Sequence, residues 1–308
     1  MTRRLLLVSN ANARNVTPYR REVIAKALSS EFSVEQVQTA HPGHAVDLAR
    51  AAAEGGVELV VALGGDGTVN EVANGLAGTQ ATLGILPGGL ANVFARSLGI
   101  PEDPVEAAGL LLQRVEAKVP SRRVPLGRID GRYFVTNCGV GFDAAIVREV
   151  ERRQKAKKRG GELFFVWTGA RAFFTGYDRR RPKVHLSWGE EDSKRRDRLF
   201  MVIFQNTSPY TYLGKRPMLL CPDARLEGAI DCFALDSMRA RTVVPLVLSS
   251  FGSGRRVRRS KHVLSLRDLP GYSVTCDEPM LVQTDGELIG ERDQVRVELA
   301  RDALSVLS

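Results

Sequence analysis

The chain has 308 residues, of which 44% are hydrophobic and 26% are charged, so it can form a globular protein with up to two domains. Its 44 lysines and arginines outnumber its 35 aspartates and glutamates, and the formal net charge of +9 favours anionic partners. No apolar run approaches the roughly 18 residues of a membrane-spanning helix, so any membrane contact is expected to be peripheral. The four cysteines lack metal-ligand spacing, which predicts reduced core thiols and a cytoplasmic location.

The first third of the chain alternates short apolar runs with amphipathic stretches. Strands are predicted at 5–8, 32–37, 59–63 and 82–86, of which 5–8 and 59–63 are continuous apolar runs. Helical periodicity follows each run, and Thr17-Pro18 is typical of a helix start. This alternation predicts a parallel sheet wrapped by helices, whose ligands bind at the carboxyl ends of the strands.

The turn after the third strand, residues 64–68, reads GGDGT and is the most informative stretch. Its glycines let the backbone approach a ligand, and the helix that follows directs N–H groups toward the turn, which favours phosphate. Asp66 would repel an anion unless a cation lay between them, so the sequence favours a Mg²⁺-nucleotide. A plain structural connection is the alternative, because neither standard nucleotide fingerprint is present.

Beyond residue 125, strand-like runs follow one another with few helical signals, which predicts a β-rich second half. Asp130-Gly131 predicts a hairpin turn between two of these runs. One helical insertion is expected between 163 and 174. The candidate strands are 133–136, 184–188, 199–205, 229–235, 272–276 and 280–283.

Two carboxylates flank a glycine in Asp285-Gly286-Glu287, between strand-like runs. The simplest interpretation is a hairpin turn. If this turn faced a nucleotide, one carboxylate could take a proton from an attacking hydroxyl while the other held it in place. The residues alone leave both interpretations open.

Two basic runs occur at 152–159 and 255–261. A solvated surface or a loop is the plain interpretation. The first run precedes an aromatic-rich segment that ends at residue 174, and basic residues beside exposed aromatics suit anionic lipid head groups. No nucleic-acid motif accompanies the charge, so nucleic-acid binding is not expected.

Four motifs occur in a fixed order along the chain. They are GGDGT with Asn70-Glu71, LPGGLAN at 86–92, NCGVGFDA at 137–144, and DGE at 285–287. Together they resemble the diacylglycerol kinase catalytic-domain family, which includes bacterial soluble lipid kinases and sphingosine and ceramide kinases. The first motif alone is also similar to NAD kinases and phosphofructokinases, so the resemblance depends on the whole set.

The resemblance implies an α/β fold in two domains. A doubly wound parallel-sheet nucleotide domain is expected over 1–124, with 294–308 as a segment that could complete it, and a predominantly β, sandwich-like lipid domain over 125–293. The implied cofactors are ATP and Mg²⁺, and the implied reaction is transfer of the γ-phosphoryl group to a lipid hydroxyl in a cleft between the domains. Peripheral membrane contact is expected through 152–174 and 255–261, and homodimer formation stays open.

The resemblance also assigns site residues. Asp285 and Glu287 are the catalytic candidates, without a decision as to which abstracts the proton. Asp66 is expected to face the Mg²⁺ of the nucleotide. The nucleotide-binding candidates are Asn10, Thr39, Gly64, Gly65, Asp66, Gly67, Thr68, Asn70, Glu71 and Gly89.

Some positions depart from the family pattern. Val93 and Pro125 stand where family members often carry acids of a water and Mg²⁺ network, and Leu90 replaces a threonine. A structural metal loop of the Asp-Gly type reads Glu227-Gly228, which makes Glu227 a candidate metal ligand. Two alternatives follow: a kinase for a soluble metabolite such as NAD, and a catalytically weak or inactive lipid-binding protein of the same fold.

Overall fold

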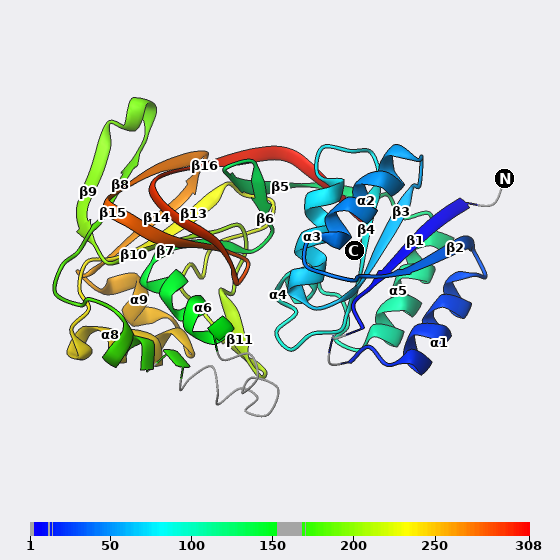
Figure 1. Ribbon diagram of the computed structural model, residues 1–308, viewed down its shortest axis with the longest axis horizontal. Coiled ribbons are helices and arrows are strands. Elements are labelled where there is room, and N and C mark those ends of the chain that lie inside the picture. The colour runs from blue at the N-terminus through cyan, green and yellow to red at the C-terminus, as the bar shows by residue number, and fades with distance from the viewer. Residues whose placement is uncertain (1–2, 12, 14, 153–167, 170) are drawn as a thin grey trace. The chain divides into compact units, whose positions relative to one another are not determined.

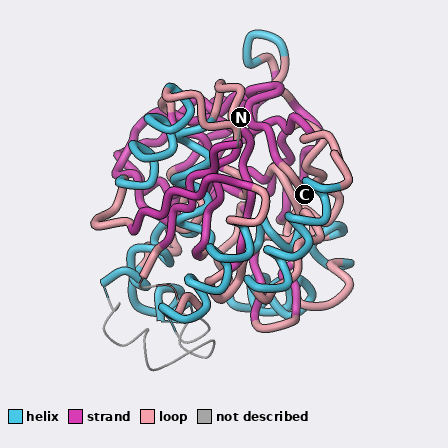
Figure 2. Tube along the Cα trace, turned by 90° about the vertical axis from the view of Figure 1, so that its right-hand side faces the viewer, coloured by secondary structure: helices cyan, strands magenta, loops and turns pink. Residues whose placement is uncertain are grey.

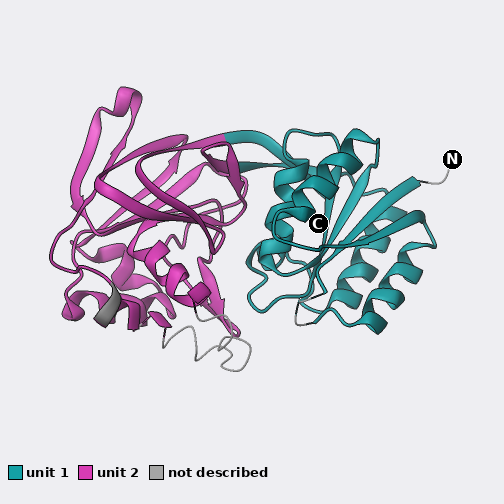
Figure 3. Ribbon diagram, viewed as in Figure 1, with its two compact units in different colours: residues 1–126, 300–308 teal, residues 127–299 magenta. Residues whose placement is uncertain are grey.

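The protein was analysed as a computed structural model that describes residues 3–11, 13, 15–152, 168–169 and 171–308 (Figure 1). Most of the basic run at 152–159, and half of the expected helical insertion at 163–174, lie outside the described residues. The chain divides into two compact units, which are described separately (Figure 3). Unit 1 comprises residues 1–126 and 300–308, and unit 2 comprises residues 127–299.

Unit 1 is built on a parallel sheet in the order β2-β1-β3-β4. The strands are β1 (Arg3–Ser9), β2 (Phe32–Gln38), β3 (Leu59–Gly64) and β4 (Thr82–Pro87). The far end of β16 (Glu287–Val306) joins this sheet, where Ser305 and Val306 pair in parallel with Thr82 and Leu83. Every residue of β3 is buried, as expected for a central strand with both faces covered.

Helices cover both faces of this sheet (Figure 1). Helix α2 packs against α3, and α1 packs against α5. Thr17 caps α1 by accepting a hydrogen bond from the backbone N–H of Arg20 at 3.2 Å, so the helix start expected at Thr17-Pro18 is confirmed. The helices are α1 (Pro18–Leu28), α2 (His44–Glu54), α3 (Asp66–Leu76), α4 (Val93–Ser97) and α5 (Pro104–Glu116).

Unit 2 is rich in antiparallel strands, and Figure 2 shows them in magenta. The main sheet has the order β14-β13-β10-β7-β15-β16, and β8 adds β9 beside β15. Strand β5 (Arg122–Ile129) begins in unit 1 and ends in unit 2. The other strands of unit 2 are β6 (Arg132–Phe134), β7 (Asn137–Gly141), β8 (Val184–Trp188), β9 (Lys194–Leu199), β10 (Met201–Gln205), β11 (Thr211–Leu213), β12 (Arg216–Met218), β13 (Ile230–Leu235), β14 (Val263–Leu269) and β15 (Gly271–Thr284). The runs expected at 272–276 and 280–283 form one strand, β15, whose pairing with β16 is irregular between Thr275 and Met280.

Unit 2 contains more helix than the sequence indicated. Besides a π-helical turn, Ala172–Gly176, and a short 3-10 turn, Glu190–Asp192, it has α6 (Phe142–Arg152), α8 (Ala240–Ser250) and α9 (Arg255–Arg259). Phe142, Phe173, Leu246 and Val257 from these segments share one buried apolar cluster. Helix α9 covers five of the seven residues of the basic run at 255–261. The one buried side chain of this run, Val257, holds it in place.

All four cysteines are free thiols, and Cys138, Cys221 and Cys232 are buried, which confirms the expected core thiols. Burial raises the pKa of each of these three thiols. Among the residues that the structure describes, no helix has the length and apolar character needed to span a membrane.

Candidate active site

Two glycine turns of unit 1 pack backbone against backbone at the carboxyl ends of β3 and β4. The Gly88 N–H donates a hydrogen bond to the Gly64 carbonyl at 2.7 Å. A Cβ on Gly89 would lie 2.7 Å from the Cα of Gly65, and a Cβ on Gly88 would lie 3.3 Å from the Cα of Gly64. Glycine is thus needed at these positions for the two turns to meet.

Helix α3 begins directly after the first of these turns. Its N-cap residue is Gly65, which has no side chain to accept hydrogen bonds from the first N–H groups of this eleven-residue helix. Gly65, Asp66 and Gly67 are half-buried, and the partial positive charge of the helix end lies among them. The buried Thr68 hydroxyl accepts a hydrogen bond from the Asn10 side chain at 3.3 Å. This arrangement suits an anion such as a phosphate.

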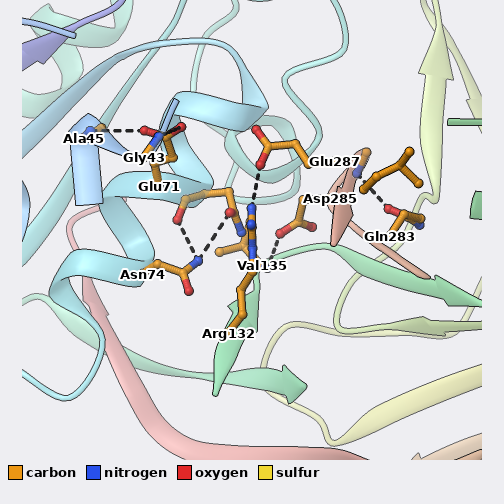
Figure 4. Close-up of polar contacts among 12 residues, drawn as sticks. Gly43, Ala45, Glu71, Asn74, Arg132, Val135, Gln283, Asp285 and Glu287 are labelled. Carbon is orange, nitrogen blue, oxygen red and sulfur yellow. Dashed lines mark hydrogen bonds and ion pairs between the residues drawn. The ribbon is translucent and has the colours of Figure 1, made fainter. Parts of the chain in front are cut away.

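Glu71 caps the neighbouring helix α2 (Figure 4). Its two carboxylate oxygens accept hydrogen bonds from the backbone N–H groups of Gly43 at 2.9 Å and Ala45 at 3.1 Å. The same loop begins at Thr39, whose N–H donates to the Ser9 carbonyl at 2.9 Å. Glu71 therefore positions the loop between β2 and α2. Contact of Glu71, Thr39 or the buried Asn70 with a nucleotide stays a prediction.

Replacement of Glu71 with glutamine is expected to lower the free energy of unfolding by about 1–2 kcal/mol. The amide oxygen can accept one of the two N–H groups, but the amide nitrogen then faces the other, and the negative charge at the helix start is lost. Urea unfolding measures the difference. Glu106→Gln in the first turn of α5 is the matched control, because Asp103 already caps that helix. Equal losses in both variants would contradict the capping role.

Asp285 opens the tight turn between β15 and β16. The φ angles of Asp285 and Gly286 are +48° and +81°, and Thr284 pairs with Glu287 across the turn. Two successive residues with positive φ are typical of the two-residue hairpin loop that Asp-Gly favours. The hairpin turn expected at this motif is confirmed.

The Asp285 carboxylate accepts four hydrogen bonds from residues 135–137 (Figure 4). One oxygen accepts from the Val135 N–H at 2.8 Å. The other accepts from the Thr136 N–H at 2.8 Å, the Thr136 hydroxyl at 2.5 Å and the Asn137 N–H at 3.0 Å. Burial raises the pKa of Asp285 and outweighs these hydrogen bonds, which lower it. The carboxylate is thus both fixed in position and more basic than an ordinary aspartate.

Glu287 has a different environment on the same turn. Its carboxylate forms an ion pair with Arg132 at 2.5 Å, and both side chains are partly exposed (Figure 4). The four hydrogen bonds to Asp285 described above come from neutral donors, whereas Glu287 is paired with a cation. The two carboxylates are therefore chemically distinct, although they are only two residues apart.

A buried polar network lies behind the turn. The Gln283 amide donates to Asp143 at 2.7 Å and to Asn137 at 2.9 Å, and its oxygen accepts from the Gly286 N–H at 2.8 Å. The Tyr210 hydroxyl donates to Asp143 at 2.6 Å. Burial raises the pKa of Asp143, and the hydrogen bonds from Tyr210 and Gln283 oppose this rise. The network ties the 137–144 motif to the hairpin turn.

Several of these positioning residues were not predicted from the sequence. They are Arg132, Thr136, Asn137, Asp143, Tyr210 and Gln283. The motif at 137–144 contributed only to the resemblance, yet it contains two of them. Gln283 could have been noticed in the sequence, because it is a lone amide at the end of an apolar run. The structure buries its side chain completely.

The carboxylates around Glu227 are engaged with arginine and backbone groups, and metal binding by Glu227 stays a prediction. Asp223 is paired with Arg267 at 2.7 Å and with Arg258 at 3.4 Å, and Asp231 accepts a hydrogen bond from the Asp268 N–H at 2.9 Å. Glu227 itself is exposed. In the described parts of the chain, no three His, Cys, Asp or Glu residues come together to hold a metal ion. Arginine supplies the positive charge at this loop.

Residues 4–124 match the family model of the diacylglycerol kinase catalytic domain. The protein named "Probable lipid kinase YegS-like" of Chromohalobacter salexigens is 39% identical over 148 residues, which cover 47% of this chain and 46% of that protein. The diacylglycerol kinase of Bacillus subtilis is 35% identical over 151 residues, 48% of each protein. The chain thus matches about half the length of these two relatives.

Other relatives align over more of the chain. A protein of Serratia proteamaculans with the same name as the first is 29% identical over 310 residues, covering 97% of this chain and 92% of that protein. A solved diacylglycerol kinase structure from Bacillus anthracis str. Sterne has a TM-score of 0.68 at 20% identity, covering 98% of this chain and 96% of the other. At this identity the likeness concerns the fold.

Residues 4–124 are thus similar to the diacylglycerol kinase catalytic domain, and these relatives are named as a diacylglycerol kinase and as probable lipid kinases.

Proposed function

We propose that the protein is an ATP-dependent lipid kinase that transfers the γ-phosphoryl group to a hydroxyl of a membrane-derived lipid. Diacylglycerol is the first acceptor to test, and a sphingoid or other amphiphilic lipid could accept the phosphoryl group through its hydroxyl in the same way. The observation that carries the proposal is the Asp285 carboxylate, fixed by residues 135–137 and raised in pKa by burial. Transfer to an alcohol needs such a proton acceptor, and the similarity of residues 4–124 to the diacylglycerol kinase catalytic domain supports nucleotide binding by unit 1.

Unit 1 would bind the nucleotide at the start of α3. Gly65, Asp66, Gly67 and Thr68 would meet the phosphates, and Asn10 would orient the Thr68 hydroxyl through their hydrogen bond. Mg²⁺ bound with the nucleotide supplies charge neutralisation of the phosphates. The close packing of Gly65 and Gly89 keeps side chains away from this end of the helix.

Unit 2 would supply the proton acceptor. As the acceptor hydroxyl oxygen bonds to the γ-phosphorus, its proton passes to Asp285, and the bond from the γ-phosphorus to the leaving oxygen of ADP breaks. Asp285 is the better candidate for this step because Glu287 is engaged with Arg132. Glu287 and Arg132 would then position the turn.

The pH dependence of the reaction tests this assignment. Because burial raises the pKa of Asp285, we expect kcat to fall with decreasing pH at values above the ordinary aspartate pKa of about 4. Rates measured from about pH 4 to about pH 9 should show this acid limb in Glu287→Gln as well as in the wild type. An acid limb at the ordinary aspartate pKa would contradict a raised pKa for the proton acceptor. An acid limb that shifts or disappears in Glu287→Gln would indicate that Asp285 is not the proton acceptor.

The activity itself is tested by incubating the full chain with labelled ATP and a panel of lipids in mixed micelles. Diacylglycerol is expected to be labelled first, followed by sphingoid bases. Transfer to NAD and to no lipid would replace the proposal with a soluble-metabolite kinase. ATP binding without transfer to any acceptor would favour an inactive lipid-binding protein, which Val93 and Pro125 keep under consideration.

A lipid acceptor places the reaction at a membrane surface. We therefore expect a cytoplasmic protein in peripheral contact with the membrane through 152–174 and 255–261, without a nucleic-acid partner. Mg²⁺ dependence and homodimer formation are proposals of the same kind. Only the second of these two segments lies fully within the described residues.

A further inference from the structure

Helix α8 exposes an apolar face. Val244, Val247 and Leu248 are 48%, 39% and 71% exposed. Their spacing of three and four residues places them on one side of the helix, while Leu246 packs into the core. Three of the eight exposed large apolar side chains of the described residues thus lie on this one helix.

Basic side chains surround this apolar face in the sequence. Residues 239–261 contain seven arginines and lysines and no aspartate or glutamate. All seven are exposed. They are Arg239, Arg241, Arg255, Arg256, Arg258, Arg259 and Lys261.

The two helices form one rigid feature. Helices α8 and α9 pack together, as Figure 1 shows, and Leu246 and Val257 anchor them in the same buried cluster. Ser249 joins them further: its carbonyl accepts from the Gly254 N–H at 2.9 Å, and its hydroxyl accepts from the Arg256 N–H at 3.0 Å. The apolar face and the basic cluster are therefore held together by the fold.

We infer that α8 and α9 form a docking surface for an anionic lipid bilayer. Apolar side chains that enter the head-group region, flanked by cations that meet lipid phosphates, are typical of helices that lie in a membrane interface. Nucleic acid fits less well, because exposed Val244 and Leu248 have no role against a phosphate backbone. The inference rests on the proposed function, and it extends the expected contact at 255–261 to α8.

Vesicle co-sedimentation of the full chain without ATP tests the surface directly. The wild type is expected to bind phosphatidylglycerol vesicles at least about tenfold more tightly than phosphatidylcholine vesicles. Val244→Asp with Leu248→Asp, and separately Arg255→Glu with Arg259→Glu, should each reduce this binding about tenfold or more. The matched control is Tyr19→Asp with Val105→Asp in unit 1, where the side chains are 76% and 39% exposed. This control should bind as the wild type does.

A second measurement uses a substitution that preserves apolar character. With phosphatidylglycerol vesicles, Leu248→Trp should show additional tryptophan fluorescence at shorter wavelength than the wild type shows under the same conditions. Brominated lipid should quench this additional fluorescence. Absence of this change, wild-type binding by both charged variants, or preference for double-stranded DNA over the vesicles would each overturn the inference.

The outcome is separable from that of the kinase assay. The Val244→Asp, Leu248→Asp variant should transfer phosphate to a short-chain, water-soluble diacylglycerol at the wild-type rate and to vesicle-embedded diacylglycerol at least about tenfold more slowly. Vesicle binding without transfer by the wild type would refute the proposed function and leave the surface standing. If the wild type transfers phosphate and the variant loses the same fraction of its rate on both acceptors, the docking surface is refuted and the proposed kinase function is not.

Discussion

The Asp285→Asn variant is expected to transfer phosphate to lipid about 10²- to 10⁴-fold more slowly than the wild type, which is the range attributed to a positioned proton acceptor. Asparagine keeps the shape of the side chain but cannot take up the proton. Steady-state rates with diacylglycerol in mixed micelles measure the loss in kcat. ATP binding to unit 1 should be unchanged, because Asp285 belongs to unit 2.

The Asp285→Asn variant is also expected to be less stable than the wild type, and this effect must be distinguished from the loss of the proton acceptor. Four donors from residues 135–137 converge on the carboxylate, and an amide nitrogen would face at least one of them. We expect the free energy of unfolding to fall by about 1–3 kcal/mol, which urea unfolding measures. Rates are therefore compared at a temperature where both proteins remain folded.

Glu287→Gln is the matched control for Asp285→Asn. It removes the charge from the partly exposed pair with Arg132, so the stability loss should be at most about 1 kcal/mol and the rate loss less than about tenfold. If Glu287→Gln is the slower enzyme, Glu287 is the proton acceptor. If both variants retain wild-type rates, neither carboxylate is.

Gly89→Ala is expected to have the largest effect in unit 1. The new Cβ would lie 2.7 Å from the Cα of Gly65 and 2.9 Å from the Asn92 side-chain oxygen, so the turns after β3 and β4 must move apart. Overpacking of this kind costs about 1–3 kcal/mol of stability. Because Gly65 caps α3, we also expect nucleotide affinity to fall about tenfold or more, since 1.4 kcal/mol corresponds to tenfold.

The control for this substitution is Gly109→Ala in α5. A Cβ at Gly109 meets nothing within 4 Å, so alanine should stabilise unit 1 by about 0.5–1 kcal/mol and leave nucleotide binding unchanged. Urea unfolding and titration with a fluorescent ATP analogue measure the two quantities. A Gly89→Ala protein as stable as the wild type would show that the turns are not closely packed in solution.

The elements of unit 1 were predictable because their signals are local. Strands β1, β3 and β4 contain short apolar runs, and the start of α1 has the Thr-Pro sequence of a capped helix. Unit 2 was harder to predict. The apolar run at 243–248 contains Pro245 and lacks clear helical periodicity, and five charges within seven residues at 255–261 gave α9 the appearance of a loop.

The site was predictable only in part, for a related reason. The Asp-Gly turn could be identified from two adjacent residues, but the partners of Asp285 lie about 150 positions earlier in the sequence. Burial of its carboxylate depends on those partners, so the rise in its pKa has no local signal. Glu71 illustrates the opposite case, in which a residue of the nucleotide motif proved to cap a helix.

Strand β16 imposes an order on the synthesis of the protein. Ser305 and Val306 complete the sheet of unit 1 beside β4, and the Leu307 N–H donates to the Leu83 carbonyl at 3.0 Å. The ribosome makes these residues only after all of unit 2. Until then, the nascent unit 1 carries an unpaired β4 edge that can pair with other chains. Chaperones that shield nascent chains should therefore matter more for this protein than for one whose first domain is continuous in sequence.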